Sequence, residues 1–560
     1  SIPPEVVDDS ESPDLAPADV EPDQSTCTAV FGETIEASGQ ICECSVYDLI
    51  GPCGAGECGT DPWFETCPIE ATYVYVRSGA QSGDGSRNSP FGTIEEAVAV
   101  APSSGHYVVV LSNVGEFEVW ETLSLSADVE WWFTGGQVNG VRAWARPESP
   151  DSVNPSRVEA QVGANPLFEV APNARAHFAF LDLRAADGDD GGSSQSGETS
   201  VVIAAHSAEL VSMWQVSLRA GAGGDGGDGD QGESGSDRAE NNQPEEQGCL
   251  QVPAKGPREG CPGVAPDELE PTPGGDGGPP VICAGIEYPN SRGGDGGDGG
   301  QDGQPGTGGA GGSGGLRDLN ATGHTSDMDG TDGQDRGQGR HGVGGGALGY
   351  LRNGLWHPAA GERGLPGNAG GGGGGGAGGR HDHDGTNFNG ASGGGGGTGG
   401  CPGGGGFGGG GGGGSIGAIL FGVNAVYLRS VSIETSNGGT GGTGGTGGQG
   451  QNGAPGGSAG HSGGWSYAGA GGDGGRGGEG GDGGGGAGGA SVGLVIGGTS
   501  GESSWTDFAA FRDVNFAIGN PGTGGEGEGT CEGGVWEDYD PCPVDGATGY
   551  TGEVLVIPAA

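Results

Sequence analysis

Short apolar runs separated by polar turns dominate residues 71–220 and predict β-strands. YVYVRS (73–78) alternates apolar and polar positions, as a strand with one buried face does, and YVVVLS (107–112) reads as a second strand. Between them, 93–101 predicts a short helix, because Thr93 is a good N-cap and Glu96 completes a capping box. Further short apolar runs extend to residue 220, so this region is predicted to be mainly β.

An apolar strand, a turn, a second strand and a glycine run occur in that order three times. The copies are 201–229, 418–445 and 491–525. Such repetition predicts a solenoid, because each unit buries its apolar face only by stacking on its neighbours. The predicted segments are 71–220 as the first part, 417–437 as a rung and 491–560 as the last part, with glycine-rich insertions at 221–416 and 438–490.

The glycine runs keep a period of three, which a flexible linker would have no reason to keep. In two of them one phase holds most of the non-glycine residues, including Asp295, Asp298, Gln301 and Thr440, Thr443, Thr446. An extended helix of three residues per turn places each such row on one face. Its main-chain groups point outward and need partners, which neighbouring glycine helices can supply. We therefore predict bundles of polyglycine II helices with these rows exposed.

Composition sets the glycine runs apart from an ordinary globular chain. Of 560 residues, 141 are glycine and 34 are proline, too few prolines for collagen and too many glycines for one apolar core throughout. The formal net charge is −53, and Lys255 is the single lysine. This charge disfavours nucleic acid and anionic membranes as partners and favours divalent cations such as Ca²⁺. The sequence contains no apolar run of 18 residues, so we predict no membrane span.

The N-terminal region differs from the rest. Residues 1–26 are acidic and proline-rich, which is typical of a disordered tail, and 27–70 is predicted to be a small disulfide-rich module. A zinc site is the alternative, supported only by the spacing of Cys53 and Cys58. All twelve cysteines are candidates for disulfides: Cys27, Cys42, Cys44, Cys53, Cys58, Cys67, Cys249, Cys261, Cys283, Cys401, Cys531 and Cys542. With a start at Ser1, they indicate a processed, secreted protein, extracellular or on the surface of a bacterium.

The run 75–101 resembles the entry to a right-handed parallel β-helix of the pectin-lyase-like superfamily. The resemblance is carried by Ser78-Gly79, Asp84, Pro90-Phe91 and the helix from Thr93 to Ala97. It implies a mainly β fold, a right-handed parallel β-helix into which polyglycine II bundles are inserted. The glycine runs themselves resemble those of glycine-rich antifreeze proteins, phage tail-tip adhesins and mycobacterial surface proteins.

That resemblance also raises polysaccharide lyase or hydrolase activity, which would need paired carboxylates or Ca²⁺ with a base. Asp189-Asp190 is present but lies in the turn DGDDGG, and the Gly-His-Gly, Arg-Ile-Lys and Trp-x-Asp-His motifs of those enzymes are missing from the sequence. We therefore do not expect an enzyme. Trp120, Trp131 and Trp132 are expected in the core, with a sugar-stacking platform as the alternative.

Weak metal candidates are Asp225 and Asp228 in an acidic glycine run, and His381 and His383 in RHDHDG. Charge density favours loose Ca²⁺ binding at the first pair, and alternating ligands on an extended chain could chelate a transition metal at the second. A solvated loop is the simpler interpretation of the second, and the first shows no sign of a dedicated high-affinity site. The threonine row raises ice binding as a minor alternative.

Together these features predict an extracellular structural protein that assembles with itself into a filament, sheath or matrix. The N-terminal tail would then dock on a neighbouring subunit. The alternative is an adhesin that binds surface glycans, or a Ca²⁺-dependent enzyme acting on them.

Overall fold

The computed structural model describes residues 36–37, 40–41 and 71–557. Within the last range it leaves out 82, 113–114, 141–142, 146–154, 240–261, 264–272, 308–310, 318–323, 353–354, 384–385, 390, 463–465, 499–508 and 528–544. The expected tail 1–26, and the expected module 27–70 apart from one short hairpin, lie outside the described residues.

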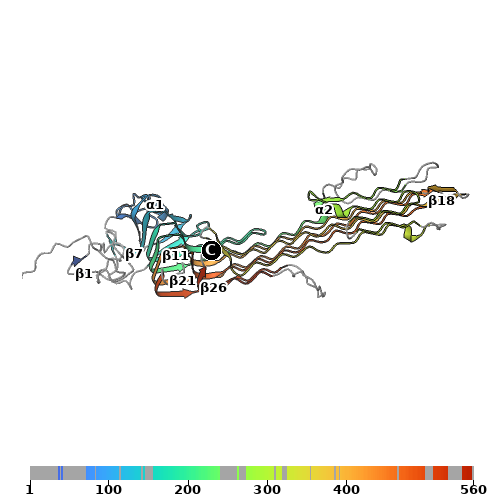
Figure 1. Cartoon of the computed structure of the whole chain (residues 1–560). Helices are drawn as coiled ribbons and strands as arrows, with labels where there is room; N and C mark the ends of the chain where they lie inside the picture. The colour runs from blue at the N-terminus through green and yellow to red at the C-terminus, as the bar shows by residue number, and fades with distance from the viewer. Residues whose placement is uncertain are drawn as a thin grey trace, which may run out of the picture.

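Two large parallel sheets form the base of the molecule (Figure 1). The smaller sheet is all parallel and has the order β6 (Leu123–Leu125), β10 (Phe168–Val170), β12 (Ser200–His206), β20 (Ser415–Phe421), β24 (Ser491–Gly497), β26 (Thr551–Ile557). The larger sheet follows the parallel path β3 (Ala71–Val76), β4 (Gly105–Ser112), β7 (Val129–Gly140), β11 (Arg175–Arg184), β13 (Leu210–Arg219), β21 (Ala425–Glu434), β25 (Ala509–Ala517). From β9 onward, the strands of the two sheets alternate along the chain, an arrangement consistent with a parallel β-helix or solenoid. We call the two sheets together the solenoid.

The remaining elements are short. Off the main path of the larger sheet, β5 (Glu116–Val119) pairs with β9 (Ser156–Ala160), β9 with β11, and β8 (Ala143–Ala145) with β7. Five hairpins are β1–β2 (Glu36–Ala37, Gln40–Ile41), β14–β15 (Val281–Cys283, Ile286–Tyr288), β16–β17 (Tyr350–Arg352, Leu355–His357), β18–β19 (Arg380–His383, Thr386–Asn389) and β22–β23 (His461–Ser462, Ser466–Tyr467). The helices among the described residues are α1 (Ile94–Ala99), α2 (Gly235–Arg238), η2 (Pro289–Ser291) and η3 (Ser326–Met328).

The three predicted repeats are confirmed as stacked rungs of this solenoid. Their first strands, β12, β20 and β24, pair side by side in the smaller sheet, and their second strands, β13, β21 and β25, pair in the larger sheet. The strand register aligns equivalent residues of each copy, for example Ile203, Ala418 and Leu494. The repeat is therefore structural, with one rung per copy.

Left-handed residues occur at two places along the rungs. The first bend joins the two sheets, at Asp128, Asn173, Ser207, Gly422 and Gly498, where φ lies between 53° and 78°. The second falls inside strands of the larger sheet, at Phe180, Gln215, Ser430 and Asp513, with φ between 48° and 56°. The strand registers place these four side by side. Each of these rungs therefore has three sides: the smaller sheet and the two halves of a bent strand.

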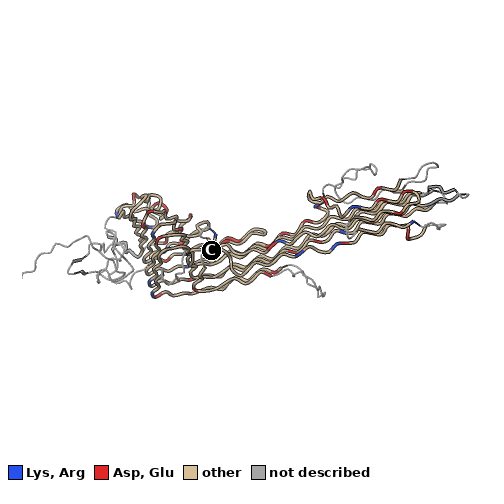
Figure 2. The backbone as a smooth tube through the Cα atoms, viewed as in Figure 1, with Lys and Arg blue, Asp and Glu red and all other residues tan. Residues whose placement is uncertain are grey.

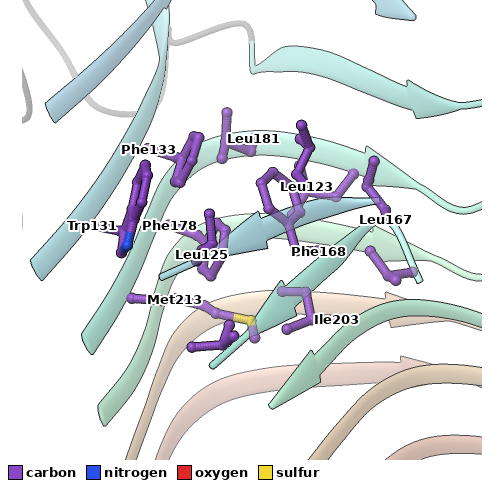
Figure 3. Packing of buried hydrophobic residues seen from close by; sticks show 14 of the residues in the cluster. Leu123, Leu125, Trp131, Phe133, Leu167, Phe168, Phe178, Leu181, Ile203 and Met213 are labelled. Carbon is purple, nitrogen blue, oxygen red and sulfur yellow. The ribbon is translucent and has the colours of Figure 1, made fainter. Parts of the chain in front are cut away.

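The apolar core lies between the sheets (Figure 3). Phe168 of the smaller sheet contacts Phe133 and Phe178 of the larger sheet edge to face, with ring centroids 5.1 Å apart in both pairs. Phe133 and Phe178 stack on each other along the solenoid axis. Inward-facing side chains from consecutive rungs thus form continuous columns.

The predicted helix is confirmed as α1. Its N-cap Thr93 accepts the main-chain N–H of Glu96, and the Glu96 carboxylate accepts the N–H of Thr93, so both halves of the capping box are present. Ile94 and Ala97 are fully buried. The helix covers the core at the start of the solenoid, beside β3, β5 and β6.

The glycine-rich segments project from the solenoid as one elongated bundle (Figure 1). The chain runs outward and back repeatedly, and β18 lies at the far end of the bundle. Among the described residues no helix is long and apolar enough to cross a membrane.

Candidate functional site: the glycine-rich bundle

The bundle grows out of one side of the solenoid. Each excursion begins where a strand of the larger sheet ends and returns to the start of the next strand of the smaller sheet. The main-chain pairing between rungs continues into it without a break, with one bond every third residue. One such set of bonds joins the glycine-rich segment that follows β13 to the one that follows β21. The N–H groups of Ala220, Gly223 and Gly226 donate to the carbonyls of Glu434, Asn437 and Thr440, respectively, at 2.8–3.0 Å.

A three-residue period governs this pairing, as segment 469–490 shows. Counting in threes from Gly469, the N–H groups donate to carbonyls of segment 359–377; counting in threes from Gly471, they donate to carbonyls of segment 439–457. The third set of positions, which begins at Ala470, holds most of the non-glycine residues. Its carbonyls accept N–H groups from a third neighbour, segment 329–345. Three phases pointing to three neighbours is the geometry expected of three residues per turn.

Aspartate side chains accept the N–H groups of this third phase. Asp329, Asp332 and Asp335 accept the N–H groups of Ala470, Asp473 and Arg476, at 2.6–2.8 Å. This acceptor row was missed in the sequence, although three aspartates at a spacing of three were its signal. Because an unpaired main-chain N–H is costly once water is excluded, these carboxylates complete the pairing of the bundle.

Aspartate carboxylates also join the candidate metal ligands Asp225 and Asp228 to the predicted threonine row. Asp225 and Asp228 are exposed, and their carboxylates accept the N–H groups of Thr440 and Thr443, at 2.7 and 2.9 Å. Thr446, one turn further on, is exposed, and its carbonyl accepts the N–H of Gly232. The threonine row therefore lies beside the aspartate row on one surface of the bundle.

The other predicted row lies in another part of the bundle. Asp295 accepts the N–H of Gly277 at 2.8 Å, and Asp298 accepts that of Gly274 at 2.9 Å; both aspartates are half-buried. Gln301 has an exposed side chain and pairs through its main chain, its N–H donating to the carbonyl of Asp298. The two aspartates of this row, like Asp225 and Asp228, are therefore hydrogen-bonded to main-chain N–H groups.

The weak metal candidates are not brought together. Asp225 and Asp228 follow directly on the end of β13, near the solenoid, whereas His381 and His383 lie on β18 at the far end of the bundle (Figure 1). Within the described ranges, no group of three or more His, Cys, Asp or Glu side chains is arranged to hold a metal ion.

A disulfide and a tryptophan fasten the bundle. Cys283 of β14 is bonded to Cys401, and both are fully buried. Trp356 of β17 packs on the outer face of the smaller sheet, against Ile416 and Val492 among others, so this hairpin folds back onto the solenoid. The other ten candidate cysteines lie outside the described residues.

A charged cluster lies on the outer side of the larger sheet. Glu130 contacts His177 at 3.1 Å, His106 at 3.3 Å and Arg175 at 3.7 Å. Burial by itself would raise the pKa of Glu130, but the hydrogen bond with His177 and the neighbouring positive charges outweigh it and lower the pKa to about 2. Burial lowers the pKa of His177 despite the opposing effect of Glu130, which favours a neutral ring at neutral pH.

The tryptophans divide between core and surface. Trp131 and Trp132 are buried, as expected; Trp131 lies in the core and Trp132 stacks on His177 with 3.8 Å between ring centroids. The expectation for Trp120 was wrong, because its exposed fraction is 62%. It follows β5, where the chain turns toward β6, and only its main-chain N–H is held, by Glu95.

Acidic residues are spread along the bundle, with fewer basic residues between them (Figure 2). Comparison of the chain with protein-family models, curated proteins and solved structures finds no match.

Proposed function

We propose that the protein is an extracellular structural subunit in which a right-handed parallel β-helix of the pectin-lyase type holds a rod of polyglycine II helices. The observation that supports it is the pairing of main-chain groups that runs from the stacked strands into the bundle every third residue. The rungs thereby set the order in which the glycine segments leave the solenoid.

A rod built in this way would be long and stiff. At a rise of about 3.1 Å per residue, segment 438–460 spans roughly 70 Å. Glycine loses much backbone entropy on ordering, and pairing in three directions offsets that loss. Such a rod suits a spacer or a wall element better than a flexible linker.

The proposal includes self-assembly into a filament, sheath or matrix, with residues 1–26 docking on a neighbouring subunit. Electron microscopy of the full chain at neutral pH, with Ca²⁺ and with a chelator, tests it. We expect regular assemblies in which a rod of about 70 Å projects from each subunit. Dispersed particles under both conditions would overturn self-assembly and bring surface glycans forward as the partner.

The role of the tail is tested separately by removing residues 1–26. If the tail joins subunits, the truncated chain stays folded by circular dichroism but no longer forms assemblies. Unchanged assemblies from the truncated chain would contradict tail docking and leave the structural role standing.

A further inference from the structure

The two ends of the solenoid differ, and the first end is closed. The outer edge of β3 is paired with the loop 85–91: Tyr75 accepts the N–H of Phe91 and donates to Gly85, both at 2.9 Å. Helix α1 covers the core behind this loop, with Ile94 fully buried. The first rung therefore offers no open strand edge along this stretch to another molecule.

Among the described residues, the last rung is not covered in this way. One inward-facing column of the smaller sheet runs through Leu125, Val170, Ala205, Leu420, Ile496 and Val556. The first five are at most 1% exposed, whereas Val556 on β26 is 47% exposed. Its side chain faces the same core as theirs but has no rung beyond it among the described residues.

The larger sheet shows the same change at the same end. Val431 and Ile433 of β21 are buried, while their neighbours in β25, Val514 and Phe516, are only partly buried. Within the described strands, β25 and β26 each pair on one side only, with β21 and β24. Apolar core and two strand edges are therefore presented together.

Residues 528–544 are too few to cover the whole of this end. Gly527 donates its N–H to the carboxylate of Asp545, so the two described residues that flank 528–544 lie together in the bundle. At about 3.1 Å per residue, Asp545 is roughly 19 Å from the start of β26. If residues 528–544 ran from the bundle to the start of β26 and back, about 12 of them would be needed at about 3.3 Å each. About five would be left to contact the edge. The strands β25 and β26 have nine and seven residues.

We propose that the open last rung is a self-association surface on which the last rung of a second copy packs, about a two-fold axis. The first rung is closed, so the matching open surface is the same end of another chain, as in isologous dimers. Neither edge strand carries proline or lysine; β26 has the single charge Glu553, and β25 has one charge of each sign, Arg512 and Asp513, so the usual protection of an edge strand is weak along β26. This inference rests on the proposed self-assembly and names one surface for it.

The variant Val556→Lys tests the surface, with Val100→Lys as the matched control. Val100 is the C-cap of α1 at the closed end and is 56% exposed, so both changes place a lysine at an exposed valine. In sedimentation velocity of the full chain, we expect wild type and V100K to associate and V556K to dissociate with a Kd at least about tenfold higher. Equal association of all three proteins would overturn the inference.

Two further measurements keep this test independent of other causes. In wild type, hydrogen exchange of the β26 amides should slow as protein concentration rises; concentration-independent exchange contradicts the proposed interface without any variant.

Removal of residues 1–26 distinguishes tail docking from association through the last rung. If truncation abolishes association while V556K leaves it unchanged, the tail joins subunits and the last rung does not. If wild type is a monomer throughout, both proposals fail.

Discussion

Asp228 and Thr443 lie 215 positions apart in the chain, and one carboxylate oxygen of Asp228 accepts both the main-chain N–H and the hydroxyl of Thr443, each at 2.9 Å. The pair joins the first outward glycine segment to one that leaves the solenoid a rung later. One turn earlier, the carboxylate of Asp225 accepts the main-chain N–H of Thr440. Polar residues at every third position thus fasten neighbouring segments to each other.

Replacing Asp228 with alanine removes the acceptor of two donors on Thr443. Because the pair is on the surface, water can replace the carboxylate, and we expect a loss of only about 0.5–1 kcal/mol in the free energy of unfolding. The main effect should be faster hydrogen exchange at the Thr443 amide. D228N keeps an acceptor oxygen and is the control. An unchanged Thr443 exchange rate in D228A would show that the bond does not protect this amide.

Gly442 allows neighbouring segments to approach closely. A Cβ there would lie 2.1 Å from the carbonyl oxygen of Gly227, which belongs to the main chain and cannot rotate away. We expect G442A to lower the free energy of unfolding by about 1–3 kcal/mol, as overpacking does. Gly346, where a Cβ would meet nothing within 4 Å, supplies the control G346A. Chemical denaturation checks both, and equal effects would contradict close packing at Gly442.

The sequence was sufficient for elements whose signal is local. The capping box of Thr93 and Glu96 involves neighbours in the chain, and alternation of apolar residues marks each strand by itself. The repeat of strand pairs predicted the stacked rungs because equivalent rungs bury equivalent positions. The period of three predicted that glycine segments would pair through their main chains, and the hydrogen bonds confirm it.

The sequence could not show which segments lie side by side. It named Asp225 and Asp228 only as weak metal candidates and the threonines as a separate exposed row, because the period fixes only the face on which a residue lies. Contacts such as Asp228 with Thr443 depend on the order in which rungs stack. The bends at Phe180, Gln215 and Ser430 had no signal either, because none of these is the glycine or asparagine that usually marks a left-handed position.

Ser430 gives a direct test of the bend inside the strand. Its φ is 52°, where a side chain branched at Cβ is strained, so we expect S430V to lower the free energy of unfolding by about 1–2 kcal/mol. Glycine relieves the strain, so S430G should be neutral or slightly stabilising. Ser432, also exposed and two residues further along β21, controls for valine in this strand. A loss in S432V as large as in S430V would remove the conformational explanation.

Glu130 makes the solenoid sensitive to acid in a defined range. Its pKa in the folded chain is about 2, below the usual value of 4.5, because the hydrogen bond with His177 and the nearby positive charges outweigh the effect of burial. A lowered folded pKa stabilises the fold above the unfolded pKa, and this contribution is lost as pH falls from about 4.5 toward 2. In E130Q that part of the pH dependence should disappear. Comparing denaturation midpoints at pH 5 and pH 3 checks it, with E118Q, an exposed carboxylate on β5, as the control. If E130Q loses as much stability between these values as wild type, Glu130 does not carry the acid sensitivity.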